Sequence, residues 1–345
     1  MLNQQNNGDE QRNMFIAMGL SVLLLMVWMT FFGPQPPTQE ELAAQREAAE
    51  LAKTDDPFAQ NDGSATVSSS GVVALEGTES RDFALAGATR APVTDEAIQG
   101  TISLKGGVID DILLPRFNNE LHPASGNVEL LQPANTDKAY FVEMGWINRD
   151  VDISQVPNLD TQWNALSDGL TRDQPMTLVY ESESLSFERS FEILDDYLVK
   201  VTQKVTNKSD DTVTLAPYAR TKRVGEVKTE GNWLVWEGTV GHADGSLQRI
   251  HYNDLEGVTE TVGSVGGWTG FTDKYWLTAV MPFTQQELIS VSTQGFLENR
   301  AQHKTTGILY SDLKIAPGSS EQAESLVYIG AKEVFRLDDY SEQYG

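Results

Sequence analysis

One uncharged segment constrains this chain more than any other feature of its sequence. Residues 14–32 read MFIAMGLSVLLLMVWMTFF and carry no charged side chain. A helix of about 20 apolar residues is long enough to cross the hydrocarbon core of a bilayer. Trp28 and two phenylalanines lie at one end of the segment, where aromatic rings favour the membrane–water interface, and Gly33-Pro34 then ends the helix. The sequence therefore predicts a transmembrane anchor at 14–32.

Two other structures compete for this segment. A cleaved signal peptide has a basic start, an apolar core of about 7–15 residues and small residues at its cleavage site. Here Arg12 is accompanied by Asp9 and Glu10, and the sequence FFGPQPP offers no A-x-A pattern. A buried core helix would have folded flanks, whereas these flanks are rich in Asn and Gln on one side and in Pro and Gln on the other. We favour an uncleaved anchor over both.

The chain is strongly acidic, with a formal net charge of −25. Only Asp9, Glu10 and Arg12 precede the anchor, so nearly all of this charge lies after it. Binding to nucleic acid requires clustered Lys and Arg, so the charge excludes nucleic acid as a partner, and it also argues against a domain that lies flat on anionic lipid. The positive-inside signal of Arg12 is weak, but a large acidic segment after an N-terminal anchor indicates export.

Residues 33–95 are predicted to join the anchor to a folded domain. Thr38-Gln39-Glu40-Glu41 has the form of a capping box, and the Ala- and Glu-rich run from there to Lys53 favours a helix. Because its apolar residues are mostly alanine, we expect a solvated helical stalk rather than a partner-binding helix. From residue 54 to residue 95 the chain is rich in Asp, Ser, Gly, Thr and Ala, which predicts a disordered linker.

From residue 96 to residue 330 the pattern changes to period-two alternation with β-branched and aromatic residues, which indicates strands. In one example Leu185, Phe187, Phe191 and Ile193 share one parity, so that strand should have one buried face. No long amphipathic helix interrupts the pattern, and many short strands predict a large antiparallel β sandwich. Residues 331–345 are predicted to form a short helix. The strands are expected at residues 101–104, 108–114, 139–144, 176–181, 185–193, 197–205, 212–217, 233–237, 275–281, 287–292 and 324–329.

The sequence carries no pattern that predicts catalysis, a metal site or a cofactor. There is no cysteine, which excludes disulfides, zinc–thiolate sites and cysteine nucleophiles. The histidines, which are His122, His242, His251 and His303, form no HExxH motif and no close pair, so a metal site has little support. Three aspartate doublets are interpreted as solvated turn residues, because neighbouring side chains in a strand point to opposite faces. These are Asp110-Asp111, Asp195-Asp196 and Asp338-Asp339.

One aromatic group is a candidate cleft or partner-binding site. Its members are concentrated in a short stretch of the chain and are Trp233, Trp236, Trp268, Tyr275 and Trp276. Aromatic rings in a cleft of a sandwich bind sugars or apolar peptide segments. The other interpretation, which we favour, is that these rings belong to the sandwich core. Trp233 and Trp236 differ in parity, so at most one of them faces the core of a regular strand.

Several stretches follow one another along the chain in a characteristic order. A short polar N-terminus leads into the anchor and then into a linker rich in Pro and Gln. The further stretches are residues 107–115, 266–268, 273–279, 339–340 and 344–345. Together they resemble the N-terminal half of the YidC-type membrane protein insertases of Gram-negative bacteria. The resemblance covers essentially the whole chain, and its most specific parts are the G-G-W…K-Y-W-x-T-A block and the final Tyr344-Gly345.

The resemblance implies a function that the residues alone do not give. Members of that family insert and help fold inner-membrane proteins, alone or with the Sec translocon. The implied arrangement is a cytoplasmic N-terminus at 1–13, a single span, and a periplasmic β-supersandwich of the mutarotase type that contacts SecD and SecF. SecYEG and nascent membrane proteins are further implied partners. Insertion uses a groove in helices expected after residue 345, so this chain would be the anchor and docking part and not an enzyme.

A second hypothesis is a membrane-anchored carbohydrate-binding or mutarotase-like module. It rests on the aromatic group and on the predicted sandwich. A mutarotase needs an acid/base pair, typically a histidine beside a carboxylate, and the scattered histidines of this chain argue against one.

Overall fold

The computed structural model describes residues 80–120, 125–227, 229, 235–285, 287–298, 301–333, 336–337, 339–340 and 343. These residues form the β domain. The predicted anchor at 14–32 and the linker up to residue 79 lie outside them. Among the helices in the described ranges, none is long and apolar enough to cross a membrane.

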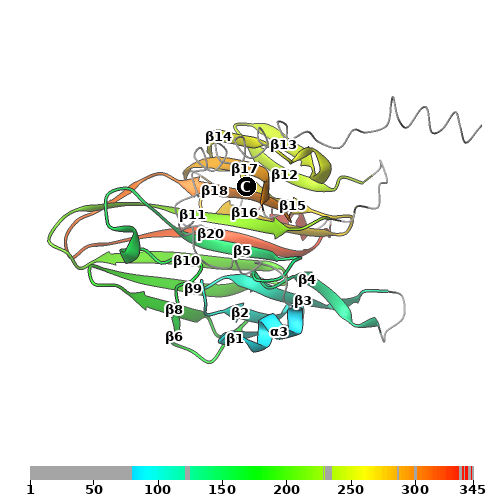
Figure 1. Ribbon diagram of the computed structural model, residues 1–345, viewed down its shortest axis with the longest axis horizontal. Coiled ribbons are helices and arrows are strands. Elements are labelled where there is room, and N and C mark those ends of the chain that lie inside the picture. The colour runs from blue at the N-terminus through cyan, green and yellow to red at the C-terminus, as the bar shows by residue number, and fades with distance from the viewer. Residues whose placement is uncertain are drawn as a thin grey trace, which may run out of the picture. The chain divides into compact units, whose positions relative to one another are not determined.

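Two large sheets face each other in this domain (Figure 1). Neighbouring strands pair antiparallel throughout the described sheets except where β1 pairs parallel with β7. The first sheet, in spatial order, contains β14 (Thr259–Val265), β17 (Leu288–Glu298), β18 (Ala301–Tyr310), β11 (Val213–Val224), β5 (Tyr140–Asn148), β3 (Ile109–Asn118), β2 (Gln99–Ser103), β1 (Arg90–Thr94) and β7 (Leu170–Thr171), with β19 (Leu313–Ile315) beside β11 and β4 (Asn127–Leu131) beside β3.

The second sheet has nine strands in the described chain. In spatial order they are β13 (Ser246–His251), β12 (Gly238–Ala243), β15 (Trp268–Thr272), β16 (Trp276–Pro282), β20 (Ser320–Ala331), β10 (Leu198–Asn207), β9 (Leu185–Asp195), β8 (Met176–Glu181) and β6 (Asn164–Ala165). Within the described ranges the helices beside the sheets are short, namely α3 (Arg81–Ala86), the 3₁₀ turns η3 (Ile153–Gln155) and η4 (Tyr252–Asp254), and a few helical residues after β20. The expected mostly β, antiparallel sandwich is confirmed.

The predicted strands overlap observed strands with one exception. Residues 235–237 are irregular, and β12 begins only at Gly238, so the prediction of a strand at 233–237 is wrong where the structure describes it. The indole N–H of Trp236 donates to the carbonyl of Thr239, which folds the ring back over the start of β12. Several strands were not predicted, because they are short or rich in polar residues, and these are β1, β4, β6, β7, β12, β13, β14, β15, β18 and β19.

The domain also begins earlier and ends differently than predicted. Helix α3 and strand β1 lie within the stretch predicted as disordered linker. Ser80 caps α3 by accepting from the N–H of Phe83, and Arg81 pairs with the buried Asp111 at 2.5 Å, so long-range pairing orders a stretch whose composition suggests disorder. At the other end, Ala331 still belongs to β20, and the described helical residues begin at residue 336.

Strand β9 shows how the two faces of a strand are sorted. Leu185, Phe187, Phe191 and Ile193 are buried as their parity predicts. Arg189 has the same parity and is buried with them at 2% exposure. The alternation therefore places a guanidinium in the interior between the sheets.

The buried guanidinium of Arg189 connects the two sheets. From β9 its Nη1 donates to the carbonyls of Gly106 and Gly107 at 3.1 and 2.8 Å, and its Nη2 donates to the carbonyl of Met144 on β5 at 2.5 Å. Its charged group also lies 4.6 Å from the ring centre of Trp163. Gly107 is required here, because its φ is +63° and a Cβ would lie 2.7 Å from Nη1. Burial lowers the pKa of Arg189 to about 10, so it remains charged at neutral pH.

Other directional contacts link the sheets along the same interior. The side-chain amide of Gln203 on β10 donates to the carbonyl of Tyr218 on β11 at 3.0 Å. Farther along, the hydroxyls of Thr269 on β15 and Thr306 on β18 are 2.5 Å apart. Because hydrogen bonds are directional, these contacts fix how one sheet is placed over the other, whereas apolar packing alone tolerates sliding.

We expect substitution of Arg189 by Met to lower the free energy of unfolding by about 3 kcal/mol or more, because three buried carbonyls lose a charged donor. The measurement is unfolding in urea, monitored by tryptophan fluorescence. Arg149→Met is the matched control, because Arg149 pairs with Asp312 at 3.0 Å on the surface, and its loss should cost under about 1 kcal/mol. Equal midpoints for the two variants would contradict the role of Arg189.

Candidate functional site

Three segments that are distant in sequence meet at one end of the nine-stranded sheet. They are the turn between β15 and β16, the end of β20, and the turn between β9 and β10. The register shows this, since Trp276 pairs with Ala331, Tyr328 with Leu198, and Leu198 in turn with Asp195. The described helical residues after β20 lie against this end. We call this region the β20 end.

An arginine–aspartate cluster occupies the β20 end, and its members are Arg116, Arg172, Arg336, Asp95, Asp195 and Asp196. Asp196 is its centre, because Arg172 and Arg336 each approach it at 3.0 Å and Arg116 also pairs with it. Arg172 reaches Asp95 at 2.9 Å, and Arg336 reaches Asp195 at 3.0 Å. Arg116 belongs to β3 of the other sheet. The cluster therefore joins both sheets to the helical residues after β20.

The charges of the cluster hold its central carboxylates ionised. Burial acts to raise the pKa of Asp196, but the hydrogen bond and charge of Arg116 and the charges of Arg336 and Arg172 keep it below 3.8. Burial likewise acts to raise the pKa of Asp95, but the hydrogen bond from Arg172 and the N–H of Ala97 keep it below 3.8. Networks of several charges are worth more than isolated surface pairs, so this cluster can hold a short helix that would be unstable alone.

Aromatic packing supports the same contact. The hydroxyl of Tyr340 donates to Asp195 at 2.8 Å, and its ring meets Tyr328 edge-on at 6.0 Å. Tyr197 lies beside Tyr328 and under the guanidinium of Arg336. Gly330 makes room for Tyr197, because a Cβ at this position would lie 2.2 Å from its ring. A tyrosine from the described helical residues is thus packed on the sheet as well as bonded to it.

A second polar cluster lies behind the turn between β15 and β16. Arg223 on β11 donates from Nη1 to both carboxylate oxygens of Asp273 at 2.8 and 2.9 Å and to the hydroxyl of Tyr252 at 2.8 Å. Its guanidinium also lies 4.6 Å from the ring centre of Tyr140. Burial raises the pKa of Tyr252, so its hydroxyl stays protonated and donates to Asp273 at 3.1 Å. Asp273 thereby fixes the turn that carries the next two aromatic residues.

The structure separates the predicted aromatic group into distinct places. Tyr275 and Trp276 lie together at the β20 end, where Trp276 meets Phe117 of β3 edge-on at 5.1 Å. The carbonyl of Tyr275 accepts from the N–H of Lys332, just after β20. Trp236 stacks on His251 at 3.8 Å. Trp268 begins β15 and pairs with His242, so it lies at the opposite end of that strand from Thr272. Trp233 lies outside the described residues.

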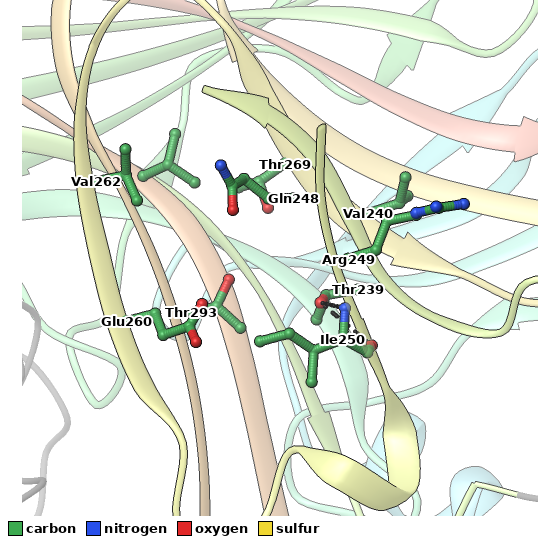
Figure 2. A pocket seen from close by; sticks show the side chains of 10 residues that line it. Thr239, Val240, Gln248, Arg249, Ile250, Glu260, Val262, Thr269 and Thr293 are labelled. Carbon is green, nitrogen blue, oxygen red and sulfur yellow. Dashed lines mark hydrogen bonds between the residues drawn. The ribbon is translucent and has the colours of Figure 1, made fainter. Parts of the chain in front are cut away.

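The open edges of the two sheets form a narrow slot (Figure 2). Gln248 and Ile250 of β13 face it from one side, and Glu260 and Val262 of β14 face it from the other. Both strands are edge strands with one partner each in the described sheets. The opposite edges end in β6 and β7, which have two residues each. Short edge strands prevent unwanted pairing, whereas longer ones present free backbone groups.

The structure also corrects the interpretation of the aspartate doublets. Asp110 and Asp111 are only 2% and 3% exposed and pair with Arg90 and Arg81 respectively, so they are not solvated turn residues. Burial raises the pKa of Asp110 despite the charge of Arg90. Asp195 ends β9 and Asp196 lies in the turn that follows, but both pair with arginines. No local spacing in the sequence predicts these partners.

Within the described chain, no three or more His, Asp or Glu side chains gather in a way that could hold a metal ion. His251 stacks on Trp236 and lies 3.2 Å from the carbonyl of Glu237 rather than beside a carboxylate.

Comparison with known proteins identifies the family. A family model described as the YidC periplasmic domain matches residues 90–344, and the chain belongs to this family. The membrane protein insertase YidC of Beijerinckia indica subsp. indica is 33% identical over 354 aligned positions, which cover 98% of this chain and 57% of that protein. The YidC of Jannaschia sp. (strain CCS1) is 35% identical, with 96% of this chain and 54% of that protein covered.

The chain thus spans about half the length of the curated relatives it matches. These relatives bear the name of an insertase and not of an enzyme. Among solved structures, a galactose mutarotase-like protein from Lactobacillus casei is similar, with a TM-score of 0.48, 8% identity, and coverage of 70% of this chain and 100% of that chain.

We expect Asp196→Asn to loosen the helical residues after β20, because three arginines lose their shared charge partner. Loss of about 1–2 kcal/mol at this contact corresponds to a roughly 5–30-fold larger open population. Trypsin cleavage after Arg336, followed by mass spectrometry, should accelerate by that factor. Asp312→Asn, which removes a surface partner of Arg149, should leave the cleavage rate unchanged. Equal rates for wild type and Asp196→Asn would contradict the assignment.

The contact should also depend on pH. Folding lowers the pKa of Asp95 and Asp196 below the ordinary aspartate value of 3.8. Their contribution to the stability of this contact is therefore present above that pH and is lost as the pH falls below it. Hydrogen exchange of the peptide that contains Tyr340, corrected for intrinsic rates, should therefore rise between pH 5 and pH 3. In Asp196→Asn this rise should be smaller, because the main titrating partner of the arginines is missing.

Proposed function

We propose that this chain is the N-terminal part of a membrane protein insertase and that it serves as an anchor and a periplasmic docking domain. The observation that carries this proposal is the family match over residues 90–344 together with insertase relatives that align over nearly the whole chain. In this proposal residues 1–13 are cytoplasmic, residues 14–32 cross the inner membrane once, and the linker leads to the β domain in the periplasm. The helices that form the insertion groove belong to the rest of the protein.

The β20 end supports a spacing role. Two of the stretches that resemble the family are far apart in sequence, but Trp276 of the first and Tyr340 of the second lie at this one end. Lys332, Arg336 and Tyr340 attach the chain after β20 to the sheet at several points. A firmly attached helix would hold the β domain in a fixed orientation to the part of the protein that comes next.

The slot between β13 and β14 is our proposed docking surface for partners. Those partners are components of the Sec translocon, namely SecD and SecF together with SecYEG, and nascent membrane proteins are the substrates of the whole insertase. The edge strands are long enough to pair with an added strand, unlike β6 and β7. Exposed Leu247, Val265 and Leu288 lie near the ends of these strands, and Val265 pairs with Leu288.

The alternative function, a carbohydrate-binding or mutarotase-like module, has less support from the geometry. The aromatic side chains on which it rested lie in separate places, and Trp276 packs against Phe117. Tyr275 remains exposed, and with Trp276 it is the part of the group that stays available as a partner-binding site.

A pair of matched substitutions tests the docking role. Val265→Lys places a charge beside the β14 edge, and Leu166→Lys places one beside β6, where the native side chains are 65% and 67% exposed. Charged edge residues prevent strand addition. We expect Val265→Lys in the full-length protein to reduce cross-linked recovery of SecD and SecF from membranes several-fold, with Leu166→Lys unchanged.

Two different results would contradict the docking role and its position on the domain. If wild type recovers no translocon component, the docking role is wrong. If both substitutions reduce recovery equally, docking stands but its place at β14 is wrong.

A further inference from the structure

A cavity of about 300 Å³ lies beside the end of β11 and the start of β18. The wall combines backbone and side chains from four segments: the end of β11, η4, the end of β17 and the start of β18. It differs from the slot between β13 and β14 and shares no residue with it. Its polar lining residues are Glu226, Tyr252, Asn253, Gln302 and Lys304.

Lys304 is the unusual residue of this cavity. It is 3% exposed, and its Nζ donates to the carbonyl of Gly225 at 3.0 Å and to Oε1 of Gln302 at 2.8 Å. Both acceptors are neutral. Among the residues that the structure describes, no carboxylate oxygen lies within ion-pair distance of Nζ. An ammonium carries three hydrogens, so one N–H remains beyond these two bonds.

The surrounding charges leave the ammonium uncompensated. Arg223 lies directly opposite Lys304 in the ladder between β11 and β18, and like charges in this position repel. Arg223 has its own partner in Asp273, so that carboxylate is already engaged. Burial, and next the charge of Arg223, lower the pKa of Lys304 to about 8, while Glu256 and Glu226 act weakly in the opposite direction.

We propose that this cavity is an anion site, in which Lys304 binds a carboxylate or phosphate-ester oxygen through its remaining N–H. A buried ammonium without a counter-charge is costly, and an anionic oxygen would supply that charge where the protein does not. Because Nζ already makes two hydrogen bonds, its third N–H suits a ligand that places one anionic oxygen beside it. Glu226 is exposed and therefore screened by solvent, so it opposes such a ligand far less than the buried ammonium attracts it.

The rival role for Lys304 is purely structural, as a brace for the turn at Gly225. In that case added anions would not change its titration. An anion that binds Nζ stabilises the charged amine and must raise its pKa, and by linkage its affinity must fall as the pH rises through about 8. The two roles therefore predict different results in one experiment.

The test is trace acylation of lysines across pH 6–11, read by mass spectrometry on the full chain in detergent micelles. Inorganic phosphate and formate are the probes, with potassium chloride at equal ionic strength as the reference. We expect the half-labelling pH of Lys304 to rise by about one unit, which corresponds to about tenfold slower labelling near pH 8. Lys314, which is exposed on β19, is the internal control and should not shift.

A second arm identifies the source of the anion. Phosphatidylcholine vesicles with and without phosphatidylglycerol replace the soluble probes. A shift with soluble phosphate or formate supports a site for a dissolved acid, and a shift only with phosphatidylglycerol supports a lipid headgroup. No shift of Lys304 in any of these conditions would overturn the anion site.

A variant gives an independent check. Phosphate stabilises folded proteins in general relative to chloride, so the comparison is between variants. Phosphate should raise the melting temperature of wild type and of Lys314→Met by more than that of Lys304→Met. A folded Lys304→Met protein that phosphate stabilises as much as wild type would also overturn the proposal.

Discussion

The two sheets of this domain keep their relative placement because a few directional contacts cross a mostly apolar interior, and the guanidinium of Arg189 is the strongest of them. Its full charge lies in the core. There it donates to the carbonyl of Met144 on β5 and to the carbonyls of Gly106 and Gly107 in the turn before β3. A charge buried in this way tolerates little displacement of its acceptors. Without Arg189, the hydrogen bonds of Gln203 and Thr269 would still link the sheets, but the charged contact between them would be lost.

The placement of the sheets decides what meets at the β20 end. Arg116 belongs to β3 and Asp196 to the turn after β9, so their ion pair requires both sheets to end at the same level. The same holds for Phe117 and Trp276, and for Arg223 and Asp273. The helical residues after β20 bind Asp195 and Asp196 of the nine-stranded sheet, and Arg116 of the other sheet shares the carboxylate of Asp196 with them. The match of this chain to the family model extends through these residues to residue 344.

Sequence patterns found the parts of the fold that depend on local burial. Strand β8 was predicted at its observed bounds, because one face of it is buried and its alternation is regular. The edge strands β13 and β14 were missed, since both faces of an edge strand meet water over much of their length and the alternation is lost. The irregular stretch before β12 was mistaken for a strand because its aromatic residues have high β propensity.

The candidate site was less predictable than the fold. Tyr275 and Trp276 were found as aromatic residues, but their neighbours Phe117 and Lys332 are distant in sequence. The arginine–aspartate cluster draws on positions from Asp95 to Arg336, so no spacing rule connects them. Arg189 could have been found, because it shares the parity of the buried residues of β9, and a charged residue on an apolar face requires a buried partner. Lys304 gave no such signal, because its strand has no simple alternation.

The helical residues after β20 are firmly held on the sheet, and a distance measured between the two tests this attachment directly. The chain contains no cysteine, so a labelled pair can be introduced without a background. Glu192 on β9 and Asp339 are both exposed and therefore suitable for labelling. A double variant with Glu192→Cys and Asp339→Cys carries one spin label at each position. Pulsed electron–electron double resonance should give one narrow distance distribution at pH 7, which broadens when Asp196→Asn is added. A broad distribution in the chain that retains Asp196 would show that the helix is not held there and would contradict the account.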